Sequence, residues 1–222
     1  MIPLRDSQPS RTTPLVTIVL IALNAAIFLH EVTLDDYSRN YFVAQYALIP
    51  GRLQLTDLVT SMFLHGGWLH LIGNMWFLWI YGDNIEDILG RSKYILFYLA
   101  CGIAAAMVHV WFNPGSRIPT VGASGAIAGV MGAYMLKFPH SRIVTLIPIV
   151  IFFTTVEIPA WIILVYWFGI QLFSGVGDLA AASGNEGGIA WFAHIGGFVA
   201  GLLLILVLPT KAPYRRYEEY RW

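Results

Sequence analysis

Residues 121–134, VGASGAIAGVMGAY, decide how the rest of the chain is organised. This stretch places one hydroxyl group, that of Ser124, between two glycines at the start of an apolar segment. Gly125 and Gly129 lie four residues apart, and this small-xxx-small spacing leaves one helix face without side chains. A second helix can therefore approach closely. By itself the pattern is typical of a packing helix that carries a serine, so its chemistry depends on the other segments.

The composition of the chain is that of a membrane protein. Of the 222 residues, 57% are hydrophobic and 12% are charged, whereas a soluble domain averages about 25% charged residues. These values predict a polytopic membrane protein that lies in a lipid bilayer. The formal net charge is zero, which argues against nucleic acid as a partner. The single cysteine, Cys101, lies in an apolar run and is predicted to be a buried thiol.

The hydrophobic pattern predicts an all-α bundle of six transmembrane helices within residues 15–208. The first apolar run resembles a signal peptide, but no small-x-small cleavage site follows, so we interpret it as a retained helix. A long connection, 31–67, is predicted to be a functional loop between helices one and two. The fifth helix has two candidates, of which 144–153 is short and 156–175 has full length. The expected helices cover residues 15–29, 68–85, 93–112, 121–139, 156–175 and 189–208.

The basic residues predict the orientation in the membrane. If the N-terminus is cytoplasmic, all but three of the 13 Lys and Arg residues fall on the inner side. The exceptions are Arg39, Arg52 and Arg117. We therefore expect cytoplasmic terminal segments at 1–14 and 209–222, with the long loop outside. A plasma membrane or a bacterial inner membrane is the favoured location.

Polar residues are predicted to meet at one depth in the bundle. Helices two, four and six all begin on the outer side, and each carries polar groups near its start. His70 and Asn74 share one face of helix two, Ser124 begins helix four, and His194 lies in helix six beside a second strip of small residues. Because polar groups are costly in a bilayer, they usually face the bundle interior for a functional reason.

These residue types suit acyl transfer. A serine hydroxyl is a weak nucleophile until a base accepts its proton, and His194 is the candidate base for Ser124. The Asn74 amide, the His70 ring and the Ser124 backbone N–H are candidate donors for an oxyanion hole. These helices carry no acidic residue suited to orient His194, so we predict a Ser–His dyad. The alternative is a hydrogen-bonded set of polar packing residues.

Three motifs carry a resemblance to a known family: HGGWLHLIGNM at 65–75, GASG at 122–125 and AHIGGFVAG at 193–201. With the six-helix order, the chain resembles the rhomboid family of intramembrane serine proteases. The resemblance implies that Ser124 is the nucleophile, that His194 is the general base, and that His70 and Asn74 help to bind the oxyanion. It also implies transmembrane protein substrates, cleavage near the outer bilayer surface and no cofactor or metal.

The resemblance further implies that water and substrate enter around helix 156–175, with residues 174–188 as a cap. The chain departs from the family pattern at Ala128, where some rhomboids carry an aromatic residue that supports the histidine. His194 is therefore expected to be oriented differently here.

Other protein classes fit the sequence less well. The GVGD sequence at 175–178 matches intramembrane aspartyl proteases, but these need two carboxylates that share a proton, and Asp178 lies in a predicted Gly/Ser-rich loop. A zinc protease would need a pattern such as HExxH. A transporter would show paired broken helices in two halves. The remaining alternative is a catalytically inactive rhomboid-like protein that binds membrane clients, although such proteins typically lack the serine or the histidine.

Overall fold

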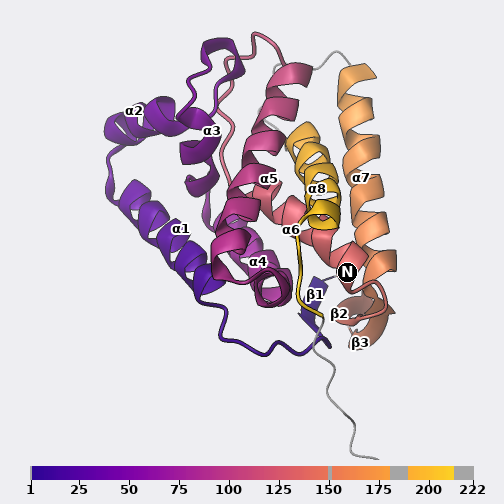
Figure 1. Cartoon of the computed structure of the whole chain (residues 1–222). Helices are drawn as coiled ribbons and strands as arrows, with labels where there is room; N and C mark the ends of the chain where they lie inside the picture. The colour runs from indigo at the N-terminus through magenta and orange to yellow at the C-terminus, as the bar shows by residue number, and fades with distance from the viewer. Residues whose placement is uncertain (1, 150–151, 181–189, 213–222) are drawn as a thin grey trace, which may run out of the picture.

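A computed structural model describes residues 2–149, 152–180 and 190–212. The predicted cap beyond residue 180 and the tail from residue 213 lie outside the described residues. The chain is mostly helical, with a small sheet at one end of the bundle (Figure 1). The elements in chain order are β1 (Ile2–Asp6), α1 (Leu15–Thr33), α2 (Asp36–Tyr46), the 3₁₀ turn η1 (Pro50–Arg52), α3 (Asp57–Thr60), the 3₁₀ turn η2 (Ser61–Phe63), α4 (Trp68–Leu89), α5 (Arg91–Phe112), α6 (Ser124–Lys137), β2 (Arg142–Ile149), β3 (Phe152–Pro159), α7 (Ala160–Ala180) and α8 (Trp191–Val207).

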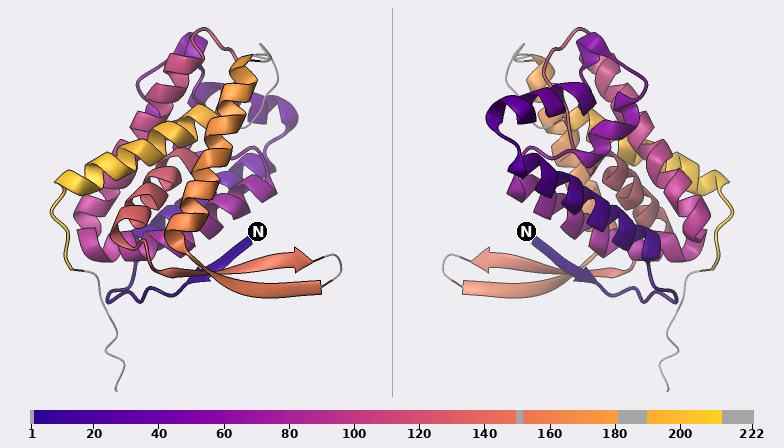
Figure 2. Two further views of the ribbon diagram at one scale, coloured as in Figure 1. Left: turned by 90° about the vertical axis from the view of Figure 1, so that its right-hand side faces the viewer. Right: turned by 90° about the vertical axis from the view of Figure 1, so that its left-hand side faces the viewer.

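Several helices have the length and composition of membrane spans. Among the described residues, α1, α5 and the part of α7 from Ala160 to Gly177 are long and apolar enough to cross a bilayer, and α8 is a shorter apolar helix. Helix α6 has only 14 residues, and most of them are buried. It is packed against α4, α5, α7 and α8, and it occupies the middle of the bundle (Figure 2).

The closest helix contact is the seam where α6 meets α8. A Cβ atom added at Gly197 would lie 1.9 Å from the carbonyl oxygen of Gly125. One added at Gly201 would lie 1.9 Å from the carbonyl oxygen of Gly129. The two backbones are therefore in direct contact along both strips of small residues, because any side chain there would collide with the facing helix. We call these four glycines the glycine seam.

A three-stranded antiparallel sheet corrects the all-α prediction. Strands β2 and β3 form a hairpin, and β1 pairs with the other edge of β2. The described residues of the short candidate for the fifth helix, 144–149 and 152–153, belong to β2 and β3. The candidate is rich in Ile, Val and Thr, whose branched Cβ atoms favour strands, and it is too short to span a bilayer. Helix α7 begins after Pro159 and runs to Ala180, so residues 174–180, which belong to the predicted cap, are helical.

The N-terminal segment is tied to the end of α4. The Glu86 carboxylate accepts hydrogen bonds from the backbone N–H groups of Val16 at 3.0 Å and Thr17 at 2.8 Å. A carboxylate at this position satisfies the free N–H groups at the start of α1 and favours its helix dipole. Nearby, the Ser10 hydroxyl donates to Asp83 at 3.0 Å. The segment predicted at 1–14 therefore packs on the bundle rather than extending from it.

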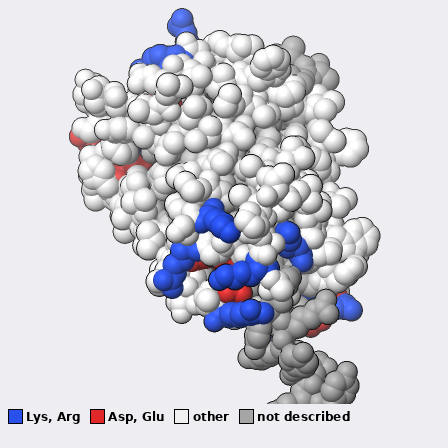
Figure 3. All heavy atoms as spheres, viewed as in Figure 1, with Lys and Arg blue, Asp and Glu red and all other residues white. Residues whose placement is uncertain are grey.

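Basic side chains gather at the sheet end of the molecule (Figure 3). Helix α5 begins there with Arg91, α6 ends there with Lys137, and β2 begins there with Arg142. Ser124 and His194 lie away from this basic end. Both residues stand in the first turn of their helices, α6 and α8, at the end of the bundle opposite the sheet.

Candidate active site

Ser124 is held at the start of α6 by a glycine turn. Gly122, two residues earlier, has a φ of 123°, a conformation that side chains other than glycine rarely adopt. Its N–H group donates to the carbonyl oxygen of Ser61 at 2.9 Å. The turn directs the chain into α6, and Ser124 becomes the first residue of that helix.

His194 meets Ser124 across the glycine seam. The Nε2 atom of His194 lies 2.7 Å from the Ser124 Oγ atom, which is hydrogen-bond distance. The two residues are 70 positions apart in sequence, and their helices are in backbone contact only one turn below. A hydroxyl within reach of an imidazole nitrogen is the arrangement that activates a serine nucleophile.

His70 and Asn74 face the backbone that precedes Ser124. A Cβ atom added at Gly122 would lie 2.8 Å from His70 Nε2 and 3.5 Å from Asn74 Nδ2. Both side chains come from the first turns of α4. The structure therefore brings together all four residues that the sequence singled out, with two side-chain donors next to the glycine turn that precedes Ser124.

A further histidine holds Asn74. The Asn74 Nδ2 atom lies 3.0 Å from His65 Nε2, and His65 precedes α4 in the loop. Burial, together with the neighbouring His70, lowers the pKa of His65 to about 4. His65 is thus neutral at neutral pH, so its ring nitrogen accepts an amide hydrogen of Asn74. Asn74 has a second amide hydrogen that it can donate to a ligand.

The family model of the Rhomboid domain matches residues 52–211. This chain belongs to the rhomboid family. The matched range contains all of the residues that form the site described above.

Curated relatives are similar to this rhomboid over much of its length. It is 28% identical to Rhomboid protein 1, mitochondrial, of Saccharomyces cerevisiae over 171 residues, which are 75% of this chain and 45% of the relative. It is 31% identical to RHOMBOID-like protein 6, mitochondrial, of Arabidopsis thaliana over 164 residues, 74% of this chain and 47% of the relative. For the human Presenilin-associated rhomboid-like protein, mitochondrial, the identity is 30% over 128 residues, with 56% and 33% covered.

The chain therefore spans less than half the length of each of these relatives. All three have mitochondrial names, whereas the sequence favoured a plasma or bacterial inner membrane. The multi-pass membrane character that the sequence predicted fits the family.

One residue near the site was missed by the sequence analysis. The Oε1 atom of Gln171, on α7, lies 2.6 Å from Nδ1 of His194, and Gln171 is only 5% exposed. One turn earlier, the ring of Trp167 lies 5.7 Å from the His194 ring, centroid to centroid. The sequence search considered only acidic partners for the histidine. Gln171 is the one amide residue in the sequence of α7, and a lone amide in an apolar span was the available signal.

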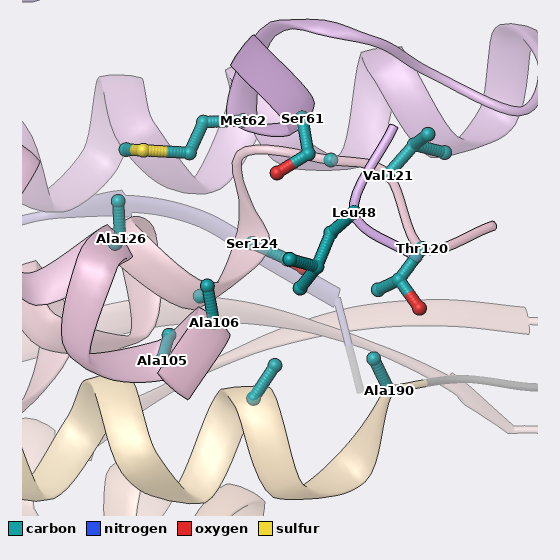
Figure 4. A pocket seen from close by; sticks show the side chains of 14 residues that line it. Leu48, Ser61, Met62, Ala105, Ala106, Thr120, Val121, Ser124, Ala126 and Ala190 are labelled. Atoms are coloured by element: carbon teal, nitrogen blue, oxygen red, sulfur yellow. The ribbon is translucent and has the colours of Figure 1, made fainter. Parts of the chain in front are cut away.

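A small cavity opens beside Ser124 in this rhomboid (Figure 4). Its volume is about 30 Å³, and its walls include Ser61, Met62, Ala105 and Thr120. A buried water needs roughly 10–15 Å³ and polar partners, so this space has room for water next to the hydroxyl. Within the described residues, no group of three or more His, Cys, Asp or Glu side chains is arranged to bind a metal ion.

Proposed function

We propose that this rhomboid is an intramembrane serine endopeptidase that cleaves transmembrane segments of other membrane proteins. The observation that carries the proposal is the 2.7 Å distance between Ser124 Oγ and His194 Nε2, at the ends of two helices in backbone contact. Because the glycine seam fixes both helices, the pair is held close before any substrate binds, and such preorganisation lowers the cost of reaching the transition state.

The residues divide the reaction between them. His194 Nε2 takes the hydroxyl proton as Ser124 Oγ bonds to the scissile carbonyl carbon. The negative charge on the carbonyl oxygen is stabilised by donors from His70, Asn74 and the Ser124 backbone. When the C–N bond breaks, the leaving amine takes the proton from His194. A water from the cavity beside Ser124 then releases the acyl group by the same steps in reverse.

The proposed arrangement in the bilayer uses α1, α4, α5, α6, α7 and α8 as six spans. The described ends of the chain, β1 and the segment around Lys211, then lie on the side where basic residues gather (Figure 3), in agreement with the positive-inside rule. The site opens toward the other surface, because Ser124 and His194 stand in the first turns of α6 and α8. A transmembrane substrate is then cut near the outer surface of the membrane.

Cleavage of a labelled transmembrane reporter by the purified, full-length protein in proteoliposomes tests this proposal. We expect Ser124→Ala and His194→Ala each to lower kcat/KM by roughly 1,000-fold or more, because nucleophile and base act as a unit. Exposed residues of the same types provide matched controls: Ser92→Ala in α5 and His140→Ala after α6 should cleave like wild type. A fluorophosphonate should label the wild type and the controls but not Ser124→Ala.

Cleavage that persists in Ser124→Ala would refute the mechanism. A wild-type protein that cleaves no reporter and resists fluorophosphonate would instead support the inactive, client-binding alternative. The rhomboid family includes inactive members as well as proteases. Labelling of Ser124 is therefore the measurement that distinguishes the two alternatives.

A further inference from the structure

Both ring nitrogens of His194 have partners, and the partners come from different helices. Nε2 faces Ser124 on α6 at 2.7 Å, and Nδ1 faces Gln171 Oε1 on α7 at 2.6 Å. Gln171 is 5% exposed. A buried amide at this distance in an otherwise apolar helix is costly unless it is hydrogen-bonded. The hydrogen bond therefore fixes the position of the Gln171 side chain and that of the His194 ring together.

The partners decide which nitrogen of His194 carries the proton. A neutral imidazole has one N–H donor and one bare nitrogen that accepts. The carboxamide oxygen of Gln171 can only accept, so Nδ1 must hold the hydrogen, and Nε2 is then left bare toward the Ser124 hydroxyl. In the other tautomer, Nε2 would point its own hydrogen at Ser124 and could not take the serine proton. Only one tautomer makes His194 a base.

We infer that Gln171 is the positioning residue for His194, holding the imidazole in the tautomer and orientation in which Nε2 accepts the proton of Ser124. This inference rests on the proposed function, since it assigns a role within the same reaction. The Nδ1–H to Oε1 hydrogen bond also persists when His194 gains its second proton, so Gln171 stabilises the imidazolium that forms during attack. An amide oxygen in this position plays the part that a carboxylate plays in Ser-His-Asp enzymes and that Asn plays in Cys-His-Asn enzymes.

The inference makes α7 part of the catalytic apparatus. Gln171 contacts an edge of the His194 ring, and Trp167, one turn earlier on the same helix, lies against the ring at 5.7 Å with an interplanar angle of 38°. Helix α7 thereby supplies the support that the small side chain of Ala128 cannot give. The base is correctly oriented only while α7 lies against α8.

A purely structural role for Gln171 is the competing explanation. Hydrogen bonds between membrane helices average less than about 1 kcal/mol, so loss of one would lower thermal stability slightly without altering the chemistry of the bound substrate. The two explanations differ in what a replacement must provide. Positioning requires an acceptor at Oε1, whereas packing requires only a side chain of the same length and shape.

Two variants of matched shape separate these explanations in the full-length protein. Gln171→Met keeps the length of the side chain and removes the acceptor; Gln171→Glu keeps the acceptor and removes the donor. We expect Gln171→Met to lower kcat roughly 10- to 100-fold with KM within twofold, in the range of losses for groups that fix a functional histidine from behind. We expect Gln171→Glu to retain kcat within about fivefold of wild type. Gln45→Met, at an exposed position of α2, is the matched control and should leave kcat unchanged.

A measurement that does not need activity completes the test. In protein with ¹⁵N-labelled histidine, the ring shifts report which nitrogen is protonated, and His194→Gln identifies the signals of that residue among the six histidines. We expect the Nδ1–H tautomer in wild type and in Ser124→Ala, and a mixture of tautomers in Gln171→Met. Equal loss of kcat in Gln171→Met and Gln171→Glu, no loss in Gln171→Met, or a wild-type Nε2–H tautomer would each overturn the inference. Failure of the proposed function is seen separately, as cleavage by Ser124→Ala or as a silent wild type.

Discussion

The glycine seam and helix α7 hold the two sides of His194 in different ways. Along the seam, α6 and α8 touch backbone to backbone, and most of α6 is buried. Helix α7 instead contacts α8 through rings, such as Phe168 stacked on Phe198 at 4.8 Å. Many of its other large side chains are exposed, among them Phe173 at 81%. The seam fixes the distance between nucleophile and base, whereas α7 is joined by contacts that separate at lower cost.

This difference suggests how one bundle can be both rigid and accessible. Where α6 and α8 are in backbone contact, even a small displacement of one helix either loses the packing or produces a collision, so the two helices have one stable arrangement. Ring contacts at a helix surface tolerate such displacement. If the proposed function holds, we expect a substrate segment to approach Ser124 beside α7, and the Gln171–His194 bond would then link displacement of α7 to the orientation of the base.

The largest expected effect comes from adding a methyl group to the seam. In Gly201→Ala the new Cβ would lie 1.9 Å from the Gly129 carbonyl oxygen, so α6 and α8 must separate. We expect the free energy of unfolding to fall by about 3 kcal/mol or more, which is the upper end of the usual cost of overpacking a core. Reporter cleavage should fall at least a hundredfold. Thermal unfolding in detergent and the cleavage assay measure the two effects.

The matched change on α7 is Gly169→Ala. No atom lies within 4 Å of the added Cβ, and alanine favours the helix by up to about 1 kcal/mol. This variant should be as stable as wild type or slightly more stable, with cleavage within twofold. If Gly201→Ala and Gly169→Ala melt at the same temperature, the proposed contrast between the two helix contacts is wrong.

A smaller effect is expected when a ring contact of α7 is removed. Phe168→Ala deletes the half-buried ring that stacks on Phe198, and we expect a cost of about 1–2 kcal/mol. Because α7 then supports Gln171 less firmly, the rate of fluorophosphonate labelling at Ser124 should fall roughly two- to fivefold. Phe173→Ala, on the exposed face of the same helix, serves as the control. Equal labelling rates in both variants would show that the contact between α7 and α8 does not affect the reactivity of Ser124.

The smallest effect concerns the end of α6 that lies next to the sheet. There the Tyr134 hydroxyl donates to the carboxylate of Asp6 in β1. Burial raises the pKa of Asp6 from its usual 3.8 to about 6, although the bond from Tyr134 opposes the shift. Between about pH 4 and pH 6 the folded protein therefore binds more protons than the unfolded chain, and stability falls as the pH rises through this range.

Asp6→Asn should remove this pH dependence. We expect the wild-type melting temperature to fall between pH 4 and pH 6 by an amount that corresponds to roughly 1–2 kcal/mol. The variant should show a flatter profile and be the more stable protein at pH 7.5. A slope of the same size in Asp6→Asn would assign the effect to a different group.

The spacing of particular residues predicted the centre of the site. Glycines four apart in two segments predicted a close pair of helices, and the same segments carried Ser124 and His194 at equal depth. The physical constraint is local in each case, because helix periodicity decides which residues share a face. His70 and Asn74 followed from the same rule applied to α4.

Two features could be found only from the folded structure. The sheet was missed because residues 144–153 are apolar, and an apolar run fits a membrane helix and a paired strand alike until its partner strand is known. Gln171 was missed because nothing in a sequence states which face of α7 meets α8, or at what depth. Composition and periodicity thus determined that this is a membrane protein with a serine and a histidine on adjoining helices. Only tertiary packing decided that a third helix reaches the far side of the histidine, since that contact depends on the relative rotation of helices distant in sequence.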